Sequence, residues 1–239
     1  MDQRRTADHG ADHAAVVCHF LKAIPVAAAM LIAAATATFS ADKSPRPYPV
    51  SDDARRLAAE LIVMRGDASR LAADEDQDPP ALSPRVRSAL TARLKGSAGP
   101  LALLLRRGGA AIAGDDVAVL RAGIEAGEWD GVVARLDQLI ARHPFDPTGI
   151  LPLDFSPKAV ALGQTLHESY CLGCHEGGDL PDWLPMPDLF EMARTLDDTE
   201  LAARFYNGVR GAAETALDQP MSAGDLGAMI SFYRTAPHH

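Results

Sequence analysis

The sequence predicts an all-α protein, and three observations support this fold class. Alanine and leucine are frequent, whereas aromatic residues make up only 5% of the 239 residues, a balance that favours helices over sheets. Apolar residues recur at helical spacing, as they do between residues 132 and 140. Serine followed by proline, a pair that is typical of helix starts, occurs at Ser83-Pro84 and at Ser156-Pro157.

The segment 1–41 is expected to direct the chain to a membrane. An uncharged run of 17 residues, Ala23–Phe39, follows a basic N-terminal flank. This order, with Ala35-Thr36-Ala37 as a cleavage site, fits a secretory signal peptide. The same run is near the shortest length that spans a bilayer, so an uncleaved single-pass anchor is an equal alternative. Under either interpretation the basic end stays inside and the remainder of the chain is exported.

A proline-rich linker and a helical region follow the apolar run. Residues 42–50 hold three prolines within five positions, which prevents a helix there. Residues 51–143 show short amphipathic patterns separated by glycine and proline, without a cluster of reactive side chains. We therefore predict a helical region of unknown role, a spacer or a docking module. The helices expected in it cover residues 51–65, 84–95, 100–107, 115–126 and 128–142, the last of them capped by His143.

An irregular connector, residues 144–155, leads to a C-terminal domain, residues 156–239. The first helix of this domain is expected to begin at Pro157, because Ser156 provides an N-cap and proline suits the first helical position. It is expected to end near Tyr170. Two further helices are expected over residues 197–207, with Gly208 as the stop, and over residues 222–235.

The most informative motif, Cys171-Leu172-Gly173-Cys174-His175, follows the first helix of this domain. Two thiols three residues apart lie on one side of a helical turn, where both can reach the two vinyl groups of one porphyrin and form thioethers. The next residue, His175, is then carried under the iron as its proximal ligand. The motif therefore predicts one covalently bound haem c, held by Cys171, Cys174 and His175.

A zinc site or a redox-active thiol pair is the alternative interpretation of these cysteines. A structural zinc site takes four Cys or His ligands, usually from two paired motifs, and the chain has no second C-x-x-C. A thioredoxin-like pair needs a βαβ context, which the sequence does not show. The third cysteine, Cys18, precedes the apolar run and is interpreted as an incidental apolar residue. Haem attachment is thus favoured over both alternatives.

The C-terminal residues 156–237 resemble the class I monohaem cytochrome c domain. Gly163 stands eight residues before the first haem cysteine, where a glycine in that family lets the N-terminal helix cross closely over the C-terminal helix. Phe232 matches the family aromatic residue that packs near this crossing. The family usually has an aromatic residue four positions after the glycine, and His167 replaces it here. The crossing helix faces away from the iron, so His167 is not expected to be a ligand.

The resemblance also implies a partner for the proximal histidine. Pro187 stands twelve residues after His175, within Met186-Pro187-Asp188-Leu189, where the family commonly has Gly-Pro-x-Leu. In that family the proline carbonyl accepts the Nδ1–H of the proximal histidine and fixes the orientation of its ring. We therefore expect Pro187 to support His175 in the same way.

Two alternatives exist for the sixth position of the iron: Met221 binds there, or Met221 is only a packing residue and does not. A low-spin electron carrier normally completes the iron with a methionine sulfur, and Met221 lies in the segment where the family carries its ligand. Met221 also immediately precedes the expected N-cap Ser222, where it would be the outer member of a hydrophobic staple. Arg210 lies in the loop that crosses the distal haem face in the family, and it is a candidate for a hydrogen bond to a propionate.

The charge distribution predicts which kind of partner the protein binds. Residues 151–239 hold 13 acidic and 5 basic residues, so they account for most of the net charge of −9. This acidity disfavours nucleic acid as a partner and suits a redox protein with a basic docking face. No acid–base or nucleophile cluster accompanies the haem motif, so no small organic substrate is expected.

We therefore expect an exported c-type cytochrome that carries single electrons and is not an enzyme. It is expected on the periplasmic side of the inner membrane, anchored there or soluble after signal cleavage, and a membrane-associated redox complex is one setting for it. Two alternatives remain. One is a haem-based sensor with an open distal site, and the other is a docking or assembly subunit with a minor redox role.

Overall fold

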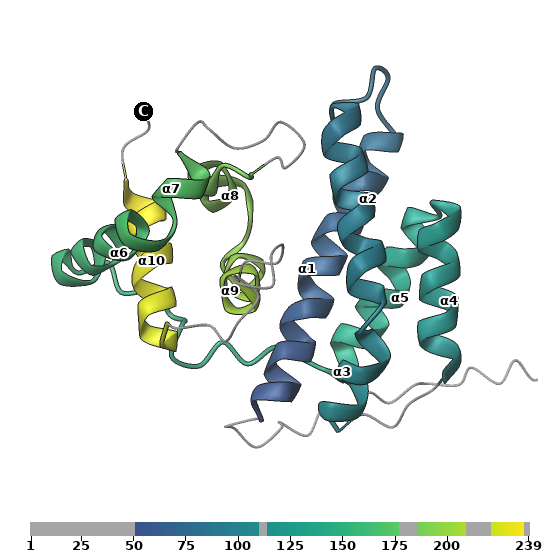
Figure 1. The fold of residues 1–239 in the computed structure, drawn as a ribbon, viewed down its shortest axis with the longest axis horizontal. Coiled ribbons are helices and arrows are strands. Elements are labelled where there is room, and N and C mark those ends of the chain that lie inside the picture. Colours follow the sequence, from purple (N-terminus) through teal and green to yellow (C-terminus); the bar gives the residue numbers. More distant parts are fainter. Residues whose placement is uncertain (1–50, 110–113, 177–185, 209–220, 237–239) are drawn as a thin grey trace, which may run out of the picture. The chain divides into compact units, whose positions relative to one another are not determined.

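The computed structural model describes four stretches of the chain, residues 51–109, 114–176, 186–208 and 221–236. The described residues all belong to one compact unit of the chain, residues 40–239. They form helices joined by turns and loops, and their one β feature is an isolated bridge between Thr148 and Leu151 (Figure 1). The predicted all-α fold class is therefore confirmed for the described part of the chain.

The first five helices form the helical region that the sequence predicts. They are α1 (Asp52–Glu75), α2 (Pro84–Ala98), α3 (Leu101–Arg107), α4 (Gly114–Ala126) and α5 (Trp129–Arg142). Two of the expected helix ends are wrong, because α1 continues well beyond residue 65 and α2 continues through Gly96. A glycine costs a helix only about 1 kcal/mol. Continuous apolar packing on both sides of Gly66 and Gly96 outweighs that cost.

Serine side chains begin the helices where the sequence expects them. The hydroxyl oxygens of Ser51, Ser83 and Ser156 each accept the backbone N–H three residues on, at 3.2, 3.3 and 3.3 Å. His143 is the C-cap of α5, and its backbone N–H donates to the carbonyl oxygen of Leu139 at 2.9 Å. These caps satisfy backbone groups that a helix end leaves unpaired.

A first hydrophobic core lies between α1 and the helices α2–α5. Most of its members are leucines that are almost completely buried, contributed by all five helices. The fully buried leucines and methionine are Leu57, Leu61, Met64, Leu71, Leu94, Leu101, Leu120, Leu136 and Leu139. Because every one of these helices buries apolar residues in this core, the region is a small helical bundle.

The C-terminal part consists of five further helices. They are α6 (Pro157–Tyr170), α7 (Leu172–His175), α8 (Leu189–Thr195), α9 (Asp198–Asn207) and α10 (Ala223–Thr235). The sequence analysis does not predict α8, which begins because the carboxylate of Asp188 accepts the N–H groups of Phe190 and Glu191 at 2.8 and 3.0 Å. Helices α6 and α10 pack against each other more extensively than any other pair among the described elements.

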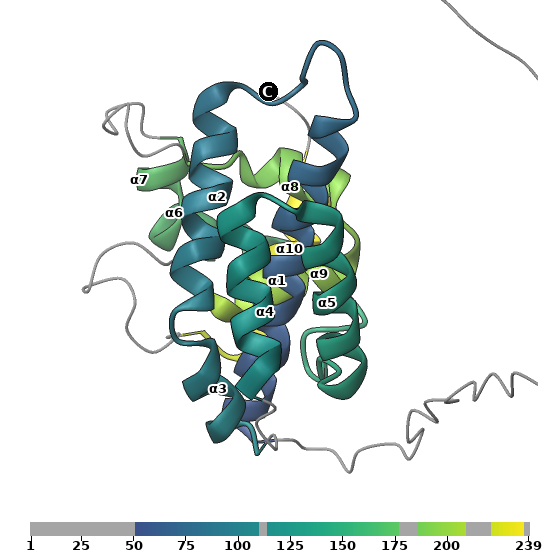
Figure 2. The same ribbon diagram turned by 90° about the vertical axis from the view of Figure 1, so that its right-hand side faces the viewer.

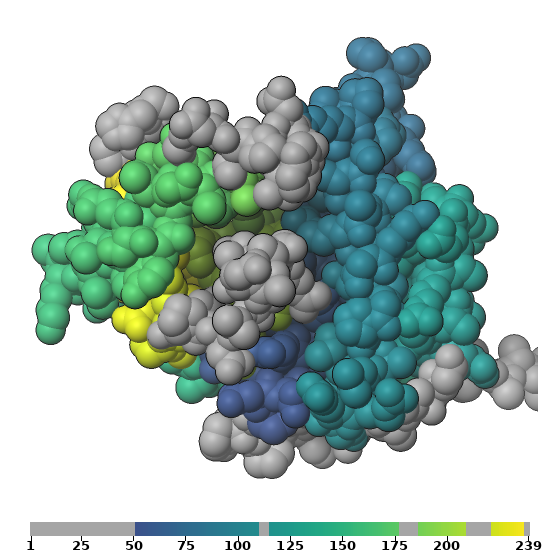
Figure 3. All heavy atoms as spheres, viewed as in Figure 1, coloured from purple at the N-terminus to yellow at the C-terminus, as the bar shows by residue number. Residues whose placement is uncertain are grey.

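Helix α1 also belongs to a second core, which it shares with the C-terminal helices. Ala58, Ala59 and Val63 of α1 pack with buried residues of α9 and α10, including Leu201 and Ile230. In Figures 1 and 2, α1 lies between the helices α2–α5 and the C-terminal helices, and Figure 3 shows the two groups with all their atoms. The two halves of residues 51–236 are therefore joined through one helix that serves both cores.

The connector between α5 and α6 is held against the start of α1. The guanidinium group of Arg55 donates to the backbone carbonyl oxygens of Asp146 and Thr148 at 2.7 and 2.8 Å. The same group lies over the ring of Tyr206, 4.7 Å from its centroid. A long loop is thus fixed by a single arginine that also contacts α9.

Within the described residues, no helix is both long enough and apolar enough to cross a membrane. The apolar run Ala23–Phe39, which the sequence analysis interprets as a signal or an anchor, lies outside them.

Candidate haem-attachment site

The C-x-x-C-H motif forms one short helical turn at the end of α6. Cys171 caps α6 and begins α7, and its carbonyl oxygen accepts the backbone N–H groups of Cys174 and His175 at 3.1 and 3.0 Å. Both thiols are free, with Cys171 half-buried and Cys174 exposed. The turn presents the two sulfurs and the imidazole from five consecutive residues, which is the arrangement that covalent attachment of a haem requires.

The proximal histidine is oriented by the residue that the resemblance implies. The Nδ1 of His175 lies 2.7 Å from the carbonyl oxygen of Pro187. A carbonyl oxygen accepts only, so Nδ1 carries the proton and the Nε2 lone pair is left for a metal. Contacts of this kind fix the ring orientation of metal-binding histidines and raise their basicity. The chemistry of His175 therefore fits an axial haem ligand.

The zinc alternative concerns how possible ligands are arranged among the residues that the structure describes. No group of three or more His, Cys, Asp or Glu side chains is arranged there to hold a metal ion. A structural zinc site takes four such ligands. Attachment of a haem would use these residues differently, because Cys171 and Cys174 would bond to the porphyrin and His175 alone would be an iron ligand.

Helices α6 and α10 cross at Gly163, as the resemblance implies. A Cβ atom at Gly163 would collide with the backbone carbonyl group of Ala228 and would lie 2.8 Å from the Cβ of Phe232. Only glycine allows this separation of the two helices. The crossing sets the position of α6 relative to α10, and Cys171 lies at the end of α6.

His167 occupies the centre of an aromatic cluster behind the motif. Its ring is 3% exposed and lies 5.6 Å from the Phe190 ring, 5.6 Å from the Phe232 ring and 5.3 Å from the Tyr233 ring, centroid to centroid. Its Nδ1 is 2.7 Å from the Tyr233 hydroxyl oxygen, and its Nε2 is 3.0 Å from the Oε1 atom of Glu176. His167 thus fills the family's aromatic position and adds two polar contacts.

The Cys171 thiol is influenced by the same cluster. Burial raises the pKa of Cys171, and a hydrogen bond with the Tyr233 hydroxyl offsets part of that rise. Burial likewise raises the pKa of Tyr233, so the phenol stays protonated. The apolar pattern of residues 222–235 predicts Tyr233 only as part of a helix face. The signal for its polar role is the histidine at a position where the family has an aromatic residue, because a buried histidine needs hydrogen-bond partners.

Met221 lies directly before the cap of α10. The Ser222 hydroxyl accepts the N–H of Asp225 at 3.2 Å, and the Asp225 carboxylate accepts the N–H of Ser222 at 2.9 Å. This is the capping box that places Met221 at the outer staple position. Met221 is half-buried against the second core, which includes the buried Leu226. Arg210, the candidate for a propionate contact, lies outside the described residues.

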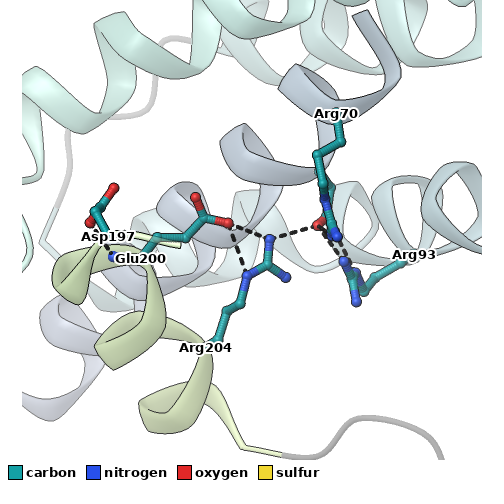
Figure 4. A network of polar contacts seen from close by, with 6 residues as sticks. Arg70, Arg93, Asp197, Glu200 and Arg204 are labelled. Atoms are coloured by element: carbon teal, nitrogen blue, oxygen red, sulfur yellow. Dashed lines mark hydrogen bonds and ion pairs between the residues drawn. The ribbon is translucent and has the colours of Figure 1, made fainter. Parts of the chain in front are cut away.

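A cluster of buried charges joins α1 to α9. The Asp67 side chain is 1% exposed and accepts hydrogen bonds from Arg70 at 2.9 Å, from Arg93, and from Arg204 at 2.8 Å. Figure 4 shows Arg204 of α9 extending towards Arg70 and Arg93, with Glu200 beside it. Glu200 accepts from Arg204 at 2.6 Å. Arg70 is only three residues from Asp67 in the sequence, whereas Arg204 is 137 residues away from it.

Burial and charge act in opposite directions on this cluster. Burial by itself raises the pKa of Asp67, but the guanidinium groups of Arg204, Arg93 and Arg70 outweigh it and lower that pKa. Burial lowers the pKa of Arg204, and Asp67 and Glu200 more than reverse that effect. Each charge therefore remains ionised because its partners are present.

A second buried acid lies two turns away on α1. The Glu60 side chain accepts the amide N–H of Asn207 at 2.7 Å, and Glu60 is 1% exposed. Glu60 and Asp67 are seven residues apart, so they lie on the same face of α1. Between them Val63 of α1 packs in the second core, and a Cβ at Gly66 would collide with the carboxylate of Glu200. The face of α1 is thus matched to α9 in both shape and charge.

The chain matches no protein-family model, no curated protein and no solved structure. The resemblance to class I cytochromes c therefore rests on the residues named above. Its two strongest supports are the His175–Pro187 contact and the helix crossing at Gly163.

Proposed function

We propose that the protein is an exported c-type cytochrome that carries single electrons through one haem, covalently attached to Cys171 and Cys174. The observation that carries this proposal is the 2.7 Å contact between His175 Nδ1 and the Pro187 carbonyl oxygen, directly after the C-x-x-C pair. That contact gives His175 the tautomer and the orientation of an axial ligand. A motif that arose by chance would not be expected to carry this support from a residue twelve positions away.

The chain's own side chains have defined tasks in this proposal. The sulfurs of Cys171 and Cys174 would hold the haem covalently, and His175 would be a ligand of its iron. When bound, the haem would supply the reversible exchange of one electron. Electron transfer of this kind needs no acid–base group and no organic substrate.

The distal ligand decides between an electron carrier and a sensor. Met221 has a competent sulfur, but the capping box at Ser222 gives it a second role as a staple. If Met221 binds the iron, the ferric protein will show the methionine–iron charge-transfer absorption band. Met221→Ala will abolish that band, and Met192→Ala, which changes another partly buried methionine of the same core, will leave it intact. A haem-based sensor is supported instead if the wild-type ferrous protein binds carbon monoxide tightly without pretreatment.

We also propose that the protein is exported and that its redox partner has a basic docking face. The apolar run Ala23–Phe39 and the C-x-x-C-H motif both point to the periplasmic side of the inner membrane, since bacterial haem attachment to this motif takes place there. The excess of acidic residues after residue 150 suits a partner with a basic docking face.

The contacts of the helical region 51–143 favour a structural role for this region, in addition to the redox role that we propose for the C-terminal helices. Its α1 contributes Ala58, Ala59 and Val63 to the core of the C-terminal helices, and Asp67 to the ion cluster of α9. We infer that the region braces the haem-bearing helices rather than serving as a detachable spacer. A docking or assembly role for its outer helices is the second candidate function.

A redox titration tests the proposed function. The purified full-length protein is reduced stepwise while its absorption spectrum is recorded, and a single transition with the slope of one electron is expected. Cys18→Ala is the control, because this cysteine lies outside the motif and its loss should change nothing. A protein without a reversible transition, or with one that requires two electrons, would refute the electron-carrier proposal.

A further inference from the structure

Arg234 of α10 holds the end of α8 and the start of α9. Its guanidinium group donates to the backbone carbonyl oxygen of Ala193, to that of Leu196 at 2.8 Å, and to the carboxylate of Asp198 at 2.6 Å. The last carbonyl groups of a helix have no partner within that helix, so Arg234 supplies donors that α8 itself lacks. The side chain is only 22% exposed, so water has limited access to these contacts. One side chain thus ties the end of α8 to α10.

Packing along α8 supports the same attachment. Leu189 and Ala193, one turn apart, are 8% and 0% exposed and belong to the second core. The ring of Phe190 lies edge-on to the rings of Phe232 and Tyr233, with centroids 5.8 and 5.0 Å apart. Helix α8 has only seven residues, too few to be stable by itself. Its position therefore depends on these contacts with α10 and on Arg234.

The other end of α8 is one peptide bond away from the carbonyl group that orients His175. Asp188 caps α8 by accepting the N–H groups of Phe190 and Glu191 at 2.8 and 3.0 Å. Pro187 directly precedes this cap, and its carbonyl oxygen lies 2.7 Å from His175 Nδ1. A displacement of α8 therefore moves the Pro187 carbonyl group with it. Because a hydrogen bond weakens steeply when its distance or angle departs from the ordinary range, the contact with His175 depends on where α8 is held.

The geometry points to Arg234 as a positioning residue for the proximal histidine. By holding α8 against α10, it keeps the Pro187 carbonyl oxygen within hydrogen-bonding distance of His175 Nδ1. This inference deepens the proposed function and rests on it for its redox consequence. A hydrogen bond at Nδ1 makes the imidazole a stronger electron donor to iron, and a stronger donor favours the ferric state. The contact therefore lowers the midpoint potential, and loss of Arg234 raises it.

The first test is the midpoint potential of the haem-loaded, full-length protein. Arg234→Lys keeps the positive charge and can still pair with Asp198, but its single nitrogen cannot reproduce the planar fork that donates to two carbonyl oxygens. Its midpoint potential is expected to rise above that of the wild type. Arg194→Met is the control, because it removes an arginine that pairs with Glu191 within α8 and leaves Arg234 in place. Removal of a positive charge by itself favours the ferric state, so the potential of this control is not expected to rise.

Hydrogen exchange at His175 reports on the contact directly. The Nδ1 proton, followed by proton NMR of the reduced protein, is expected to exchange with solvent faster in Arg234→Lys than in the wild type. Arg194→Met is expected to keep the wild-type rate. General destabilisation would also speed exchange of the backbone amides of α10, so these amides serve as the internal reference. Arg234→Gln, which can donate to one carbonyl oxygen only, has the same expected exchange behaviour and replaces Arg234→Lys if that variant does not fold.

The outcomes separate this inference from the proposed function. An unchanged or lowered potential in Arg234→Lys, or an unchanged exchange rate at His175 Nδ1, would overturn the inference and leave the electron-carrier proposal intact. A wild-type chain without covalent haem would overturn the proposed function, and nitrogen-15 spectra of the His175 imidazole at about pH 8, where an ordinary histidine is neutral, would then test the positioning role alone. The wild type is expected to hold the proton on Nδ1, and Arg234→Lys to move part of it to Nε2. Identical spectra of the two proteins would overturn the positioning role.

Discussion

Gly163 is the residue at which the packing of α6 against α10 depends most directly on the absence of a side chain. A Cβ there would meet the Ala228 carbonyl group, which belongs to the backbone of α10 and cannot rotate away. Gly131 offers the opposite situation, because its added Cβ would meet nothing within 4 Å on the exposed side of α5. The two positions make a matched pair for measuring what the helix crossing requires.

Gly163→Ala is expected to lower the free energy of unfolding by about 1–3 kcal/mol, because the added methyl group forces α6 and α10 apart. Gly131→Ala is expected to be neutral or to stabilise by about 0.5–1 kcal/mol, since alanine is the better helix former. Urea denaturation followed by circular dichroism measures both. Equal effects of the two substitutions would show that α6 and α10 do not need the close approach.

At the scale of residues, the sequence predicts a feature correctly where a single residue indicates it. The serine caps at residues 51, 83 and 156 and the crossing at Gly163 follow from local patterns and a family resemblance. The role of His167 does not, because its partners Glu176 and Tyr233 come from other elements and only the folded chain brings them together. The sequence showed the departure at this position without showing what it is for.

At the scale of elements, the contact between α1 and α9 is built around one buried carboxylate. Replacing Asp67 by Asn leaves Arg204 buried at 7% side-chain exposure with its main counterion lost. Removing one member of a buried pair typically costs about 3–5 kcal/mol. Asp137→Asn is the control, because the Arg65–Asp137 pair is exposed on both sides and is worth at most about 1 kcal/mol. Similar losses of unfolding free energy in the two variants would contradict a special role for Asp67.

The same carboxylate predicts how stability depends on pH. The folded state lowers the pKa of Asp67, so the unfolded chain takes up its proton first as the pH falls. The stability contributed by Asp67 is therefore complete above about pH 4, the ordinary range of an aspartate, and is lost progressively below it. The difference in unfolding free energy between the wild type and Asp67→Asn should shrink as the pH is lowered from about 6 to 3. A difference that stays constant would show that Asp67 has no lowered pKa.

Element boundaries show where sequence patterns stop being informative. The first helix is expected to end near residue 65, yet α1 continues to Glu75 because apolar residues on both sides of Gly66 pack in the two cores. The full length of α1 therefore depends on packing partners that lie far away in the sequence. The short helix α8 was missed for another reason, since its seven residues are too few for a clear apolar period.

At the scale of the molecule, helix α1 makes the two cores interdependent. It carries Leu57, Leu61 and Met64 into the first core and Ala58, Ala59 and Val63 into the second. Loss of either core would leave one face of α1 exposed. Residues 51–143 and the C-terminal helices α6–α10 are therefore expected to unfold together.

Thermal unfolding of the haem-loaded protein tests this dependence. Helix content followed by far-ultraviolet circular dichroism and the haem environment followed by Soret absorption should change in one transition with the same midpoint. A variant with Leu136→Ala, which damages only the first core, should lower both midpoints equally. Two separate transitions, or a Soret midpoint that ignores Leu136→Ala, would show that the two regions are independent domains.

The proposed function depends above all on covalent attachment at Cys171 and Cys174. The most direct measurement is the intact mass of the full-length protein, produced in cells that attach haem to C-x-x-C-H motifs and analysed after denaturation and reduction. The wild type and Cys18→Ala are expected to carry the added mass of one haem, and the double variant Cys171→Ala/Cys174→Ala is expected to carry none. A wild-type protein without this added mass, or a double variant that retains it, would contradict the proposal that this chain is a c-type cytochrome.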